Sequence, residues 1–188
     1  MGKYDAAKEI ISKSFPAAQL APQDASDWQG PFALSEEVLE YYRDFGPCDA
    51  ALEHIASTFF LPSLARLWEH QAGYRYHPDT KEVFPDWDDD WLVIADEGAD
   101  PFIYVRSSGQ ILHDWHGGRS WDPKFFCENL ETMVTVLATS CDIVCAAGGM
   151  YADLDDSYPM AVSRFAELFG NEIDAREMMG KLGWGEWK

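Results

Sequence analysis

The sequence predicts an α+β fold: a single domain in which helices pack on a mixed, mostly antiparallel sheet, with further helices at the C-terminus. Three observations indicate this fold. Short aromatic and β-branched runs lie in the middle of the chain, at residues 91–95 and 102–105. Apolar residues at three- and four-residue spacing come before and after these runs. The length of 188 residues, with 47% hydrophobic and 14% aromatic residues, is typical of a one-domain globular protein.

The chain divides into three segments. Residues 1–31 are expected to hold a helix and an irregular segment, residues 32–140 the α+β domain, and residues 141–188 a helical extension packed on the same domain. The first helix is predicted over residues 4–14 from its apolar spacing. It ends before Pro16, because the residue preceding a proline is disfavoured in the α region. The polar stretch that follows shows no periodicity.

The clearest helix signals lie between Ser35 and Gly46. Ser35 is suited to cap the N-terminus, and the two acids after it interact favourably with the helix dipole. Gly46 is suited to a left-handed C-terminal cap, and Pro47 prevents continuation of the helix.

The next stretch is less clear. Residues 51–60 fit a helix or a strand, with a strand favoured near residues 58–61. Pro62 fits the first turn of a second core helix that ends at Gly73. Aromatic and polar residues then alternate over residues 74–85, which predicts a small hairpin.

The centre of the chain predicts an antiparallel meander. Residues 91–95 and 102–105 are expected to form two strands joined by an acidic turn. Because residues 102–105 are apolar on both faces, the sheet should be covered on both sides. A turn at residues 106–109 would return the chain as a third strand over residues 110–115.

Helices are expected to complete the fold. Residues 122–123, Asp-Pro, are suited to open a helix whose apolar stripe covers the sheet. The spacing continues to Gly148, and it leaves open whether the helix runs on or breaks at residues 139–140. Two more helices are expected, over residues 157–170 and 171–183.

Charge and cysteine content limit the function classes. The chain has 33 acidic residues against 14 Lys plus Arg, a formal net charge of −19. Such a charge repels nucleic acid and anionic membranes and attracts a cationic partner, although an acidic surface also serves solubility. We find no signal peptide and no run of 18 apolar residues, so no membrane span is expected. Four cysteines without a C-x-x-C pair predict a reduced, cytoplasmic protein: Cys48, Cys127, Cys141 and Cys145.

A series of motifs in a fixed order covers about half of the chain. They are the capped helix ending at Phe45-Gly46, then Phe60-Leu-Pro-Ser-Leu64, Trp91-Leu-Val-Ile-Ala-Asp-Glu-Gly98, Asp100-Pro-Phe102, and His116-Gly117 with Trp121 before a Phe-rich helix. In this order, residues 34–137 resemble the SUKH superfamily, which includes fungal cell-wall-assembly regulators and many bacterial immunity proteins. The resemblance implies an α+β domain that binds other proteins and has no family-wide catalytic residues. It also implies that bacterial members bind and block the enzymatic domain of a toxin.

These observations predict a cytoplasmic, non-enzymatic immunity protein of bacterial type that binds a basic toxin domain and needs no cofactor. Its oligomeric state is left open. One alternative is a regulatory or scaffolding protein without a toxin partner, and another is a metal-dependent hydrolase that uses the acids between Asp86 and Asp90. Acids and aromatics around the central turn are the candidate partner-binding residues: Asp86, Trp87, Asp88, Asp89, Asp90, Trp91, Asp96, Glu97 and Asp100.

Metal sites are weakly indicated. The acids between Asp86 and Asp90 offer the oxygen ligands that Ca²⁺ or Mg²⁺ requires, but the spacing lacks the glycine and the final glutamate of an EF-hand loop. His113 and His116 would point to opposite faces of a strand, which disfavours a zinc pair.

A nucleophile is also weakly indicated. There is no Gly-x-Ser-x-Gly elbow, and Ser120 next to Arg119 has no base at a predictable distance. Residues 117–119, Gly-Gly-Arg, fit an anion-binding loop or an ordinary turn, and we favour the turn.

Overall fold

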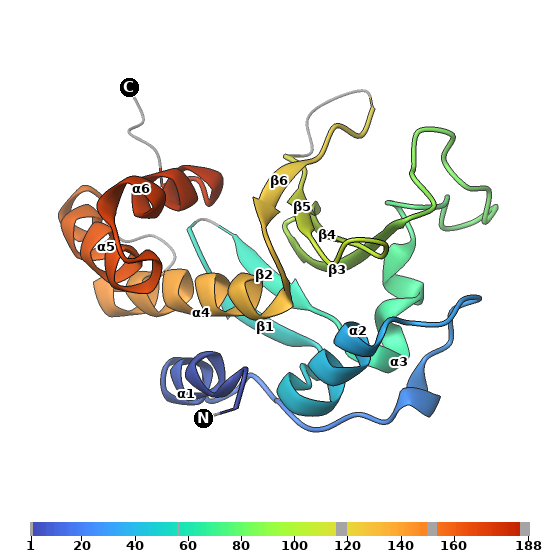
Figure 1. Cartoon of the computed structure of the whole chain (residues 1–188), viewed down its shortest axis with the longest axis horizontal. Helices are drawn as coiled ribbons and strands as arrows, with labels where there is room; N and C mark the ends of the chain where they lie inside the picture. Colours follow the sequence, from blue (N-terminus) through green and yellow to red (C-terminus); the bar gives the residue numbers. More distant parts are fainter. Residues whose placement is uncertain (1, 56, 116–119, 150–153, 185–188) are drawn as a thin grey trace.

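An antiparallel sheet forms the centre of the protein (Figure 1). The computed structural model describes residues 2–55, 57–115, 120–149 and 154–184. Within these ranges the sheet has six strands in the order β1-β2-β3-β4-β5-β6, and every pairing is antiparallel. The strands are β1 Ala50–Glu53, β2 Thr58–Leu61, β3 Trp91–Glu97, β4 Asp100–Val105, β5 Ile111–His113 and β6 Lys124–Cys127. The predicted α+β fold and its central meander are therefore confirmed.

Helices pack around this sheet. Those in the described ranges are α1 Asp5–Ser14, η1 Ala25–Asp27, α2 Glu36–Glu40, η2 Tyr41–Phe45, α3 Leu64–Leu67, η3 Glu69–Gln71, α4 Leu130–Ala147, α5 Leu154–Phe169 and α6 Glu172–Lys181. The long helix α4 contacts β1 and β6, and it is flanked by α1 and α5 (Figure 1). Helix α6 packs on α5, so the C-terminal helices belong to the same folded unit.

The sheet has a core on each face. Leu92 and Ile94 of β3 are fully buried in the main core, which also receives side chains from α1, α2, α4, α5 and α6. Val93 and Ile103 are equally buried but belong to a second core on the opposite face, with Tyr74. Because neighbouring residues of a strand point to opposite faces, β3 and β4 are apolar on both sides, as predicted.

A two-residue turn joins the central strands. Glu97 of β3 pairs with Asp100 of β4, and the two residues between them have left-handed backbones, with φ of 61° at Gly98 and 88° at Ala99. Positive φ at both central positions matches the twist of a tight hairpin. The turn therefore holds Glu97 and Asp100 opposite each other.

The helix that begins after Ser35 follows the predicted signals. The Ser35 Oγ accepts a hydrogen bond from the Val38 N–H at 3.3 Å. The last turn widens into a π-helix, η2, and Gly46 ends it with φ of 65°. The Gly46 carbonyl accepts a hydrogen bond from the Ala21 N–H at 2.8 Å, so the helix end also anchors the N-terminal segment.

We expect Gly46→Ala to lower the free energy of unfolding by about 2 kcal/mol. A Cβ at this position would lie 2.0 Å from the Ala21 carbonyl oxygen, in addition to the backbone strain. Gly73→Ala is the control, because φ there is 92° but the added Cβ would meet nothing within 4 Å. Urea unfolding of both variants separates clash from strain, and equal losses would contradict the role given to the Ala21 contact.

The helix predicted from residues 122–123 was wrong. The chain there enters strand β6, which pairs with β5, and helix α4 begins only after Asn129, whose Oδ1 accepts from the Thr132 N–H at 2.9 Å. An Asp-Pro pair fits a strand entry as well as a helix entry, and the two phenylalanines of β6 favour a strand. Helix α4 then runs on through residues 139–140 to Ala147.

Other local predictions were only partly met. The helix expected between Pro62 and Gly73 is reduced to one α-turn, α3, and one 3₁₀ turn, η3. Residues 74–85 hold an isolated bridge between Tyr76 and Val83 in place of a regular hairpin. Strand β1 falls where the pattern was ambiguous, and α5 begins ahead of the expected start at residue 157.

Helix α4 is the one helix of the described residues that is long and apolar enough to cross a membrane by length and composition alone. Of the 18 residues in this window, 61% are buried inside the protein. The same length and composition are found in core helices, and α4 lies against the sheet, α1 and α5.

Candidate functional site

The acidic loop is the segment between Asp86 and Asp90, which enters β3. Asp89 of this loop forms an ion pair with Arg75. The Asp89 side chain is 90% exposed, and its Oδ1 lies 2.5 Å from Arg75 Nη2. The Arg75 guanidinium also donates to the backbone carbonyls of Asp89 and Trp91, at 3.3 and 3.4 Å. Arg75 thus binds the C-terminal end of the acidic loop.

The other acids of the loop make backbone contacts. Asp90 accepts hydrogen bonds from the N–H and the hydroxyl of Ser107, which fixes the loop to the turn between β4 and β5. The Asp88 carboxylate accepts from the Asp90 N–H at 2.8 Å, and the Asp86 carboxylate accepts from the Trp121 N–H at 3.1 Å. Asp86 and Asp88 are exposed. The loop is therefore fixed in conformation, while the side chains of Asp86, Asp88 and Asp89 remain exposed.

Tryptophans support the loop. Trp87 is only 6% exposed and belongs to the second core. Its ring lies edge-on to Trp91 and Trp121, with centroids 5.3 and 5.4 Å apart. Trp91 is half-buried. Trp87 therefore stiffens the base of the loop, and of the two predicted tryptophans Trp91 offers more surface to a partner.

The predicted acids at the end of β3 lie in a different setting. Asp96 Oδ2 lies 2.9 Å from His70 Nε2, and both side chains are mostly covered, at 13% and 15% exposed. Burial, and then the charge of Asp96, raise the pKa of the Tyr74 hydroxyl far above its usual range. The charge of half-buried Asp100 acts on Tyr74 in the same direction. Asp96 is therefore mostly covered and Asp100 is half-buried, and both lie at the opposite end of β3 from the acidic loop.

Glu97 lies inside the protein, in a buried chain of polar groups. Its Oε1 is 2.7 Å from His54 Nδ1 and also accepts from the Ser57 hydroxyl. On the other side of the ring, His54 Nε2 is 2.6 Å from Ser140 Oγ in the middle of α4. The Trp184 indole N–H donates to the same Ser140 Oγ at 2.8 Å. This series of hydrogen-bonded side chains connects the β1–β2 connection, β3, α4 and the C-terminal segment.

The order Ser140, His54, Glu97 is that of a catalytic triad, in which the histidine takes the serine proton and the acid orients the histidine. Here His54 and Ser140 are fully buried, and Ser140 Oγ also accepts from Trp184. A substrate carbonyl has no room beside this hydroxyl. We therefore interpret the three residues as a structural network that satisfies buried polar groups.

A cavity of about 570 Å³ is lined in part by Arg75, the residue that pairs with Asp89 of the acidic loop. Aromatic Trp68 and Tyr76 line it together with Arg75 and Lys81. The Arg75 guanidinium lies 5.9 Å from the centroid of the Trp68 ring, a cation–π arrangement. Arg75 therefore lines this cavity and also binds the acidic loop through its ion pair with Asp89.

Three weakly indicated sites are not built by the described residues. His116 and residues 117–119 lie outside the ranges that the structure describes. Within those ranges, no group of three or more His, Cys, Asp or Glu side chains is placed to hold a metal ion. The acids between Asp86 and Asp90 point to Arg75, Ser107 and backbone N–H groups in place of a common centre.

Comparison with protein-family models, with curated proteins and with solved structures found no match to this chain. The resemblance to the SUKH superfamily therefore rests on the order of its sequence motifs.

Proposed function

We propose that this chain is a non-enzymatic, protein-binding domain that binds and blocks the enzymatic domain of a bacterial toxin with a basic surface. It would act in the cytoplasm and without a cofactor. The proposal is supported by the net charge of −19 and by the SUKH-like order of motifs. An acidic surface raises the rate of association with a cationic partner and disfavours nucleic acid and anionic membranes.

The observation that carries the proposal is the acidic loop, held in one conformation with its carboxylates outward. Arg75, Ser107 and the Trp121 backbone fix it, and Trp87 fills the space beneath it. A surface that is already ordered loses less conformational entropy on binding than a mobile one. Lys or Arg side chains of a toxin would pair with the exposed carboxylates of Asp86 and Asp88.

The direct test is inhibition of the toxin domain encoded beside this chain's gene. Equimolar purified chain is expected to abolish the enzymatic activity of that domain and to form a one-to-one complex with it. A stable complex that leaves the enzymatic activity intact would favour the regulatory or scaffolding alternative. Absence of both binding and inhibition at low salt would overturn the proposal.

Replacing Asp88, Asp89 and Asp90 together with Asn is expected to weaken toxin binding about tenfold or more at low salt. The effect should shrink as salt screens the charges. Stability should fall by only about 1 kcal/mol, because Asn retains an acceptor oxygen and the Arg75 guanidinium, whose side chain is 11% exposed, keeps the backbone carbonyls of Asp89 and Trp91 as acceptors. Titration calorimetry at two salt concentrations measures the affinity.

A charge-matched control separates position from net charge. Glu9, Asp79 and Glu167 are exposed, and their carboxylates have no hydrogen-bond or ion-pair partner among the described residues. Changing these three to Gln, Asn and Gln removes the same charge elsewhere on the surface. Equal weakening by the two triple variants would assign the acids of the loop to solubility.

A further inference from the structure

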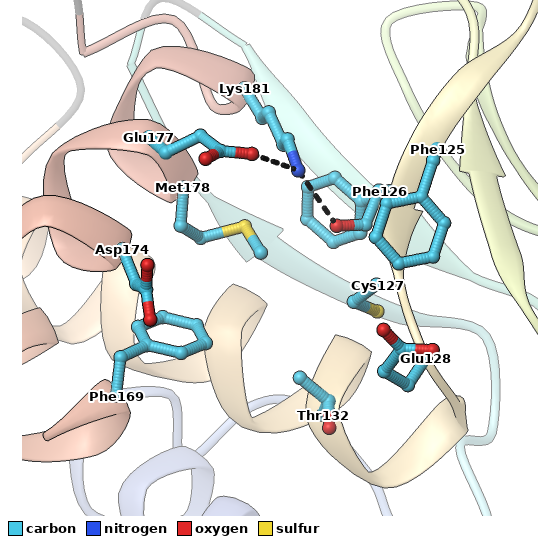
Figure 2. A pocket seen from close by; sticks show the side chains of 10 residues that line it. All are labelled: Phe125, Phe126, Cys127, Glu128, Thr132, Phe169, Asp174, Glu177, Met178 and Lys181. Carbon is cyan, nitrogen blue, oxygen red and sulfur yellow. Dashed lines mark hydrogen bonds and ion pairs between the residues drawn. The ribbon is translucent and has the colours of Figure 1, made fainter.

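A groove lies between the last strand of the sheet and the C-terminal helices. Its walls come from β6 and the start of α4 on one side and from α6 and the end of α5 on the other (Figure 2). It encloses about 350 Å³. Phe125 and half-buried Phe169 provide most of its apolar surface, whereas Phe126 and Met178, at 1% and 6% exposed, close its floor (Figure 2). The groove is thus an apolar channel alongside the edge of a sheet.

The free edge of β6 faces this groove. β6 is the terminal strand of the sheet, and its other edge pairs with β5. The Phe126 carbonyl accepts a long hydrogen bond, 3.4 Å, from Lys181 of α6 (Figure 2). Phe126 lies at the register shift between β5 and β6, and its carbonyl is the backbone group that the Lys181 contact places toward the groove. Unpaired edge groups are a template for another strand.

The charged residues of the groove favour a cationic occupant. Glu128, Asp174 and Glu177 line it, against the single lysine Lys181. Glu177 is already paired with Lys181 at 3.0 Å. Glu128 is exposed, and within the described residues its carboxylate has no hydrogen-bond or ion-pair partner.

Apolar side chains are exposed next to the groove. Phe125 is 42% exposed, and its ring lies 5.2 Å from the Lys181 Nζ. Leu168 of α5, at 40%, and Ile173 of α6, at 79%, are exposed residues of the two helices that form the other wall. Exposed apolar residues that cluster with polar ones at a groove are typical of protein-binding surfaces.

We infer that this groove binds an extended segment of a protein partner, which adds to β6 as a further strand and carries Lys or Arg beside an apolar side chain. A backbone N–H of the segment would replace Lys181 on the Phe126 carbonyl. A cationic side chain would pair with Glu128, and the apolar one would pack between Phe125 and Met178. In Figure 1 α6 lies on the left and the acidic loop on the right of the molecule, so the groove is a separate surface from that loop.

The probe is a synthetic library of eight-residue peptides with every position varied, presented to the immobilised full-length chain. Enriched peptides are expected to carry Lys or Arg within two positions of an apolar residue. At saturation, the best peptide should slow hydrogen exchange of backbone amides in β6, and N-methylation of the peptide's central amides should abolish binding. Absence of enrichment, enrichment of acidic peptides, or unchanged exchange throughout β6 would overturn the inference.

A matched pair of variants tests the charge. Glu128→Lys is expected to weaken the best peptide about tenfold. Asp79→Lys makes the same charge change at an exposed site without a side-chain partner in the described chain, and it should leave affinity unchanged. Equal affinity for the two variants would contradict the groove as the site. Neither variant alters the acidic loop, so a failure here leaves the toxin proposal to its own test.

Discussion

Replacing His54 with alanine is expected to lower the free energy of unfolding by about 3–5 kcal/mol. The ring is fully buried and joins Glu97 Oε1, at 2.7 Å, to Ser140 Oγ, at 2.6 Å. Its removal leaves the Glu97 carboxylate, in a residue only 7% exposed, without its main partner. The variant also leaves a cavity against Phe59, whose ring stacks on His54 with centroids 4.4 Å apart.

Urea unfolding at neutral pH measures this loss. His77→Ala is the control, because His77 is exposed and bonds only to backbone N–H groups of its own turn. We expect it to cost less than about 1 kcal/mol. A loss below about 1 kcal/mol for His54→Ala would contradict the network.

The energetic coupling between His54 and Glu97 can be measured separately. In the His54→Ala background, Glu97→Gln is expected to be neutral or stabilising, because an unpaired buried amide is less unfavourable than an unpaired buried carboxylate. In the unmodified chain the same change should destabilise. Additive effects of the two substitutions would show that Glu97 and His54 do not depend on each other.

Much of the fold follows from local signals. The cap at Ser35 and the stop at Gly46 are visible in the sequence because each depends on a few neighbouring residues. The central strands are visible because burial on both faces requires continuous apolar runs. By contrast, β6 was missed because Asp122-Pro123 is an equally good signal for a helix start, and only pairing with β5 decides between them.

The buried network was not predicted, for a related reason. His54 and Ser140 are 86 positions apart, and neither lies in a motif. Glu97 was assigned to the surface because it follows Asp96 next to a turn, yet the β2–β3 pairing of Phe59 with Glu97 brings it to the β1–β2 connection that holds His54. A polar residue at the end of a strand gives no local sign of such a partner.

The acidic loop was found from its sequence, but the contacts that hold it were not. The four aspartates and one tryptophan of residues 86–90 are visible as a cluster in the sequence. Arg75 and Ser107 come from turns elsewhere in the chain. Only these contacts distinguish a fixed acidic surface from a mobile acidic tail. The groove beside β6 was likewise invisible, because it requires both the edge position of β6 and the docking of α6.

Acidification is expected to lower the free energy of unfolding by about 3 kcal/mol, because His113 is buried in the folded protein. Burial lowers the pKa of His113 to about 4, although the nearby charge of Glu97 acts in the opposite direction. In the unfolded chain a histidine has a pKa near ~6.5. As pH falls from about 6.5 to about 4, the unfolded chain binds a proton that the folded protein does not. The stabilisation is therefore complete above pH ~6.5 and disappears as the pH approaches ~4.

The variant His113→Phe should remove this dependence, because Phe keeps the stacking on Phe102, whose ring centroid is 4.3 Å away, and carries no titrating group. The free energy of unfolding is measured in urea at several pH values between about 7 and 5, a range that covers about half of the expected loss of stability. All other titrating groups are the same in both proteins, so the difference between the two pH profiles reports on His113. His77→Phe is the control, since His77 is exposed. Parallel pH profiles for the unmodified chain and His113→Phe would mean that the pKa of His113 is the same in the folded and the unfolded protein, whereas a flatter profile only for His113→Phe assigns the acid sensitivity to its burial.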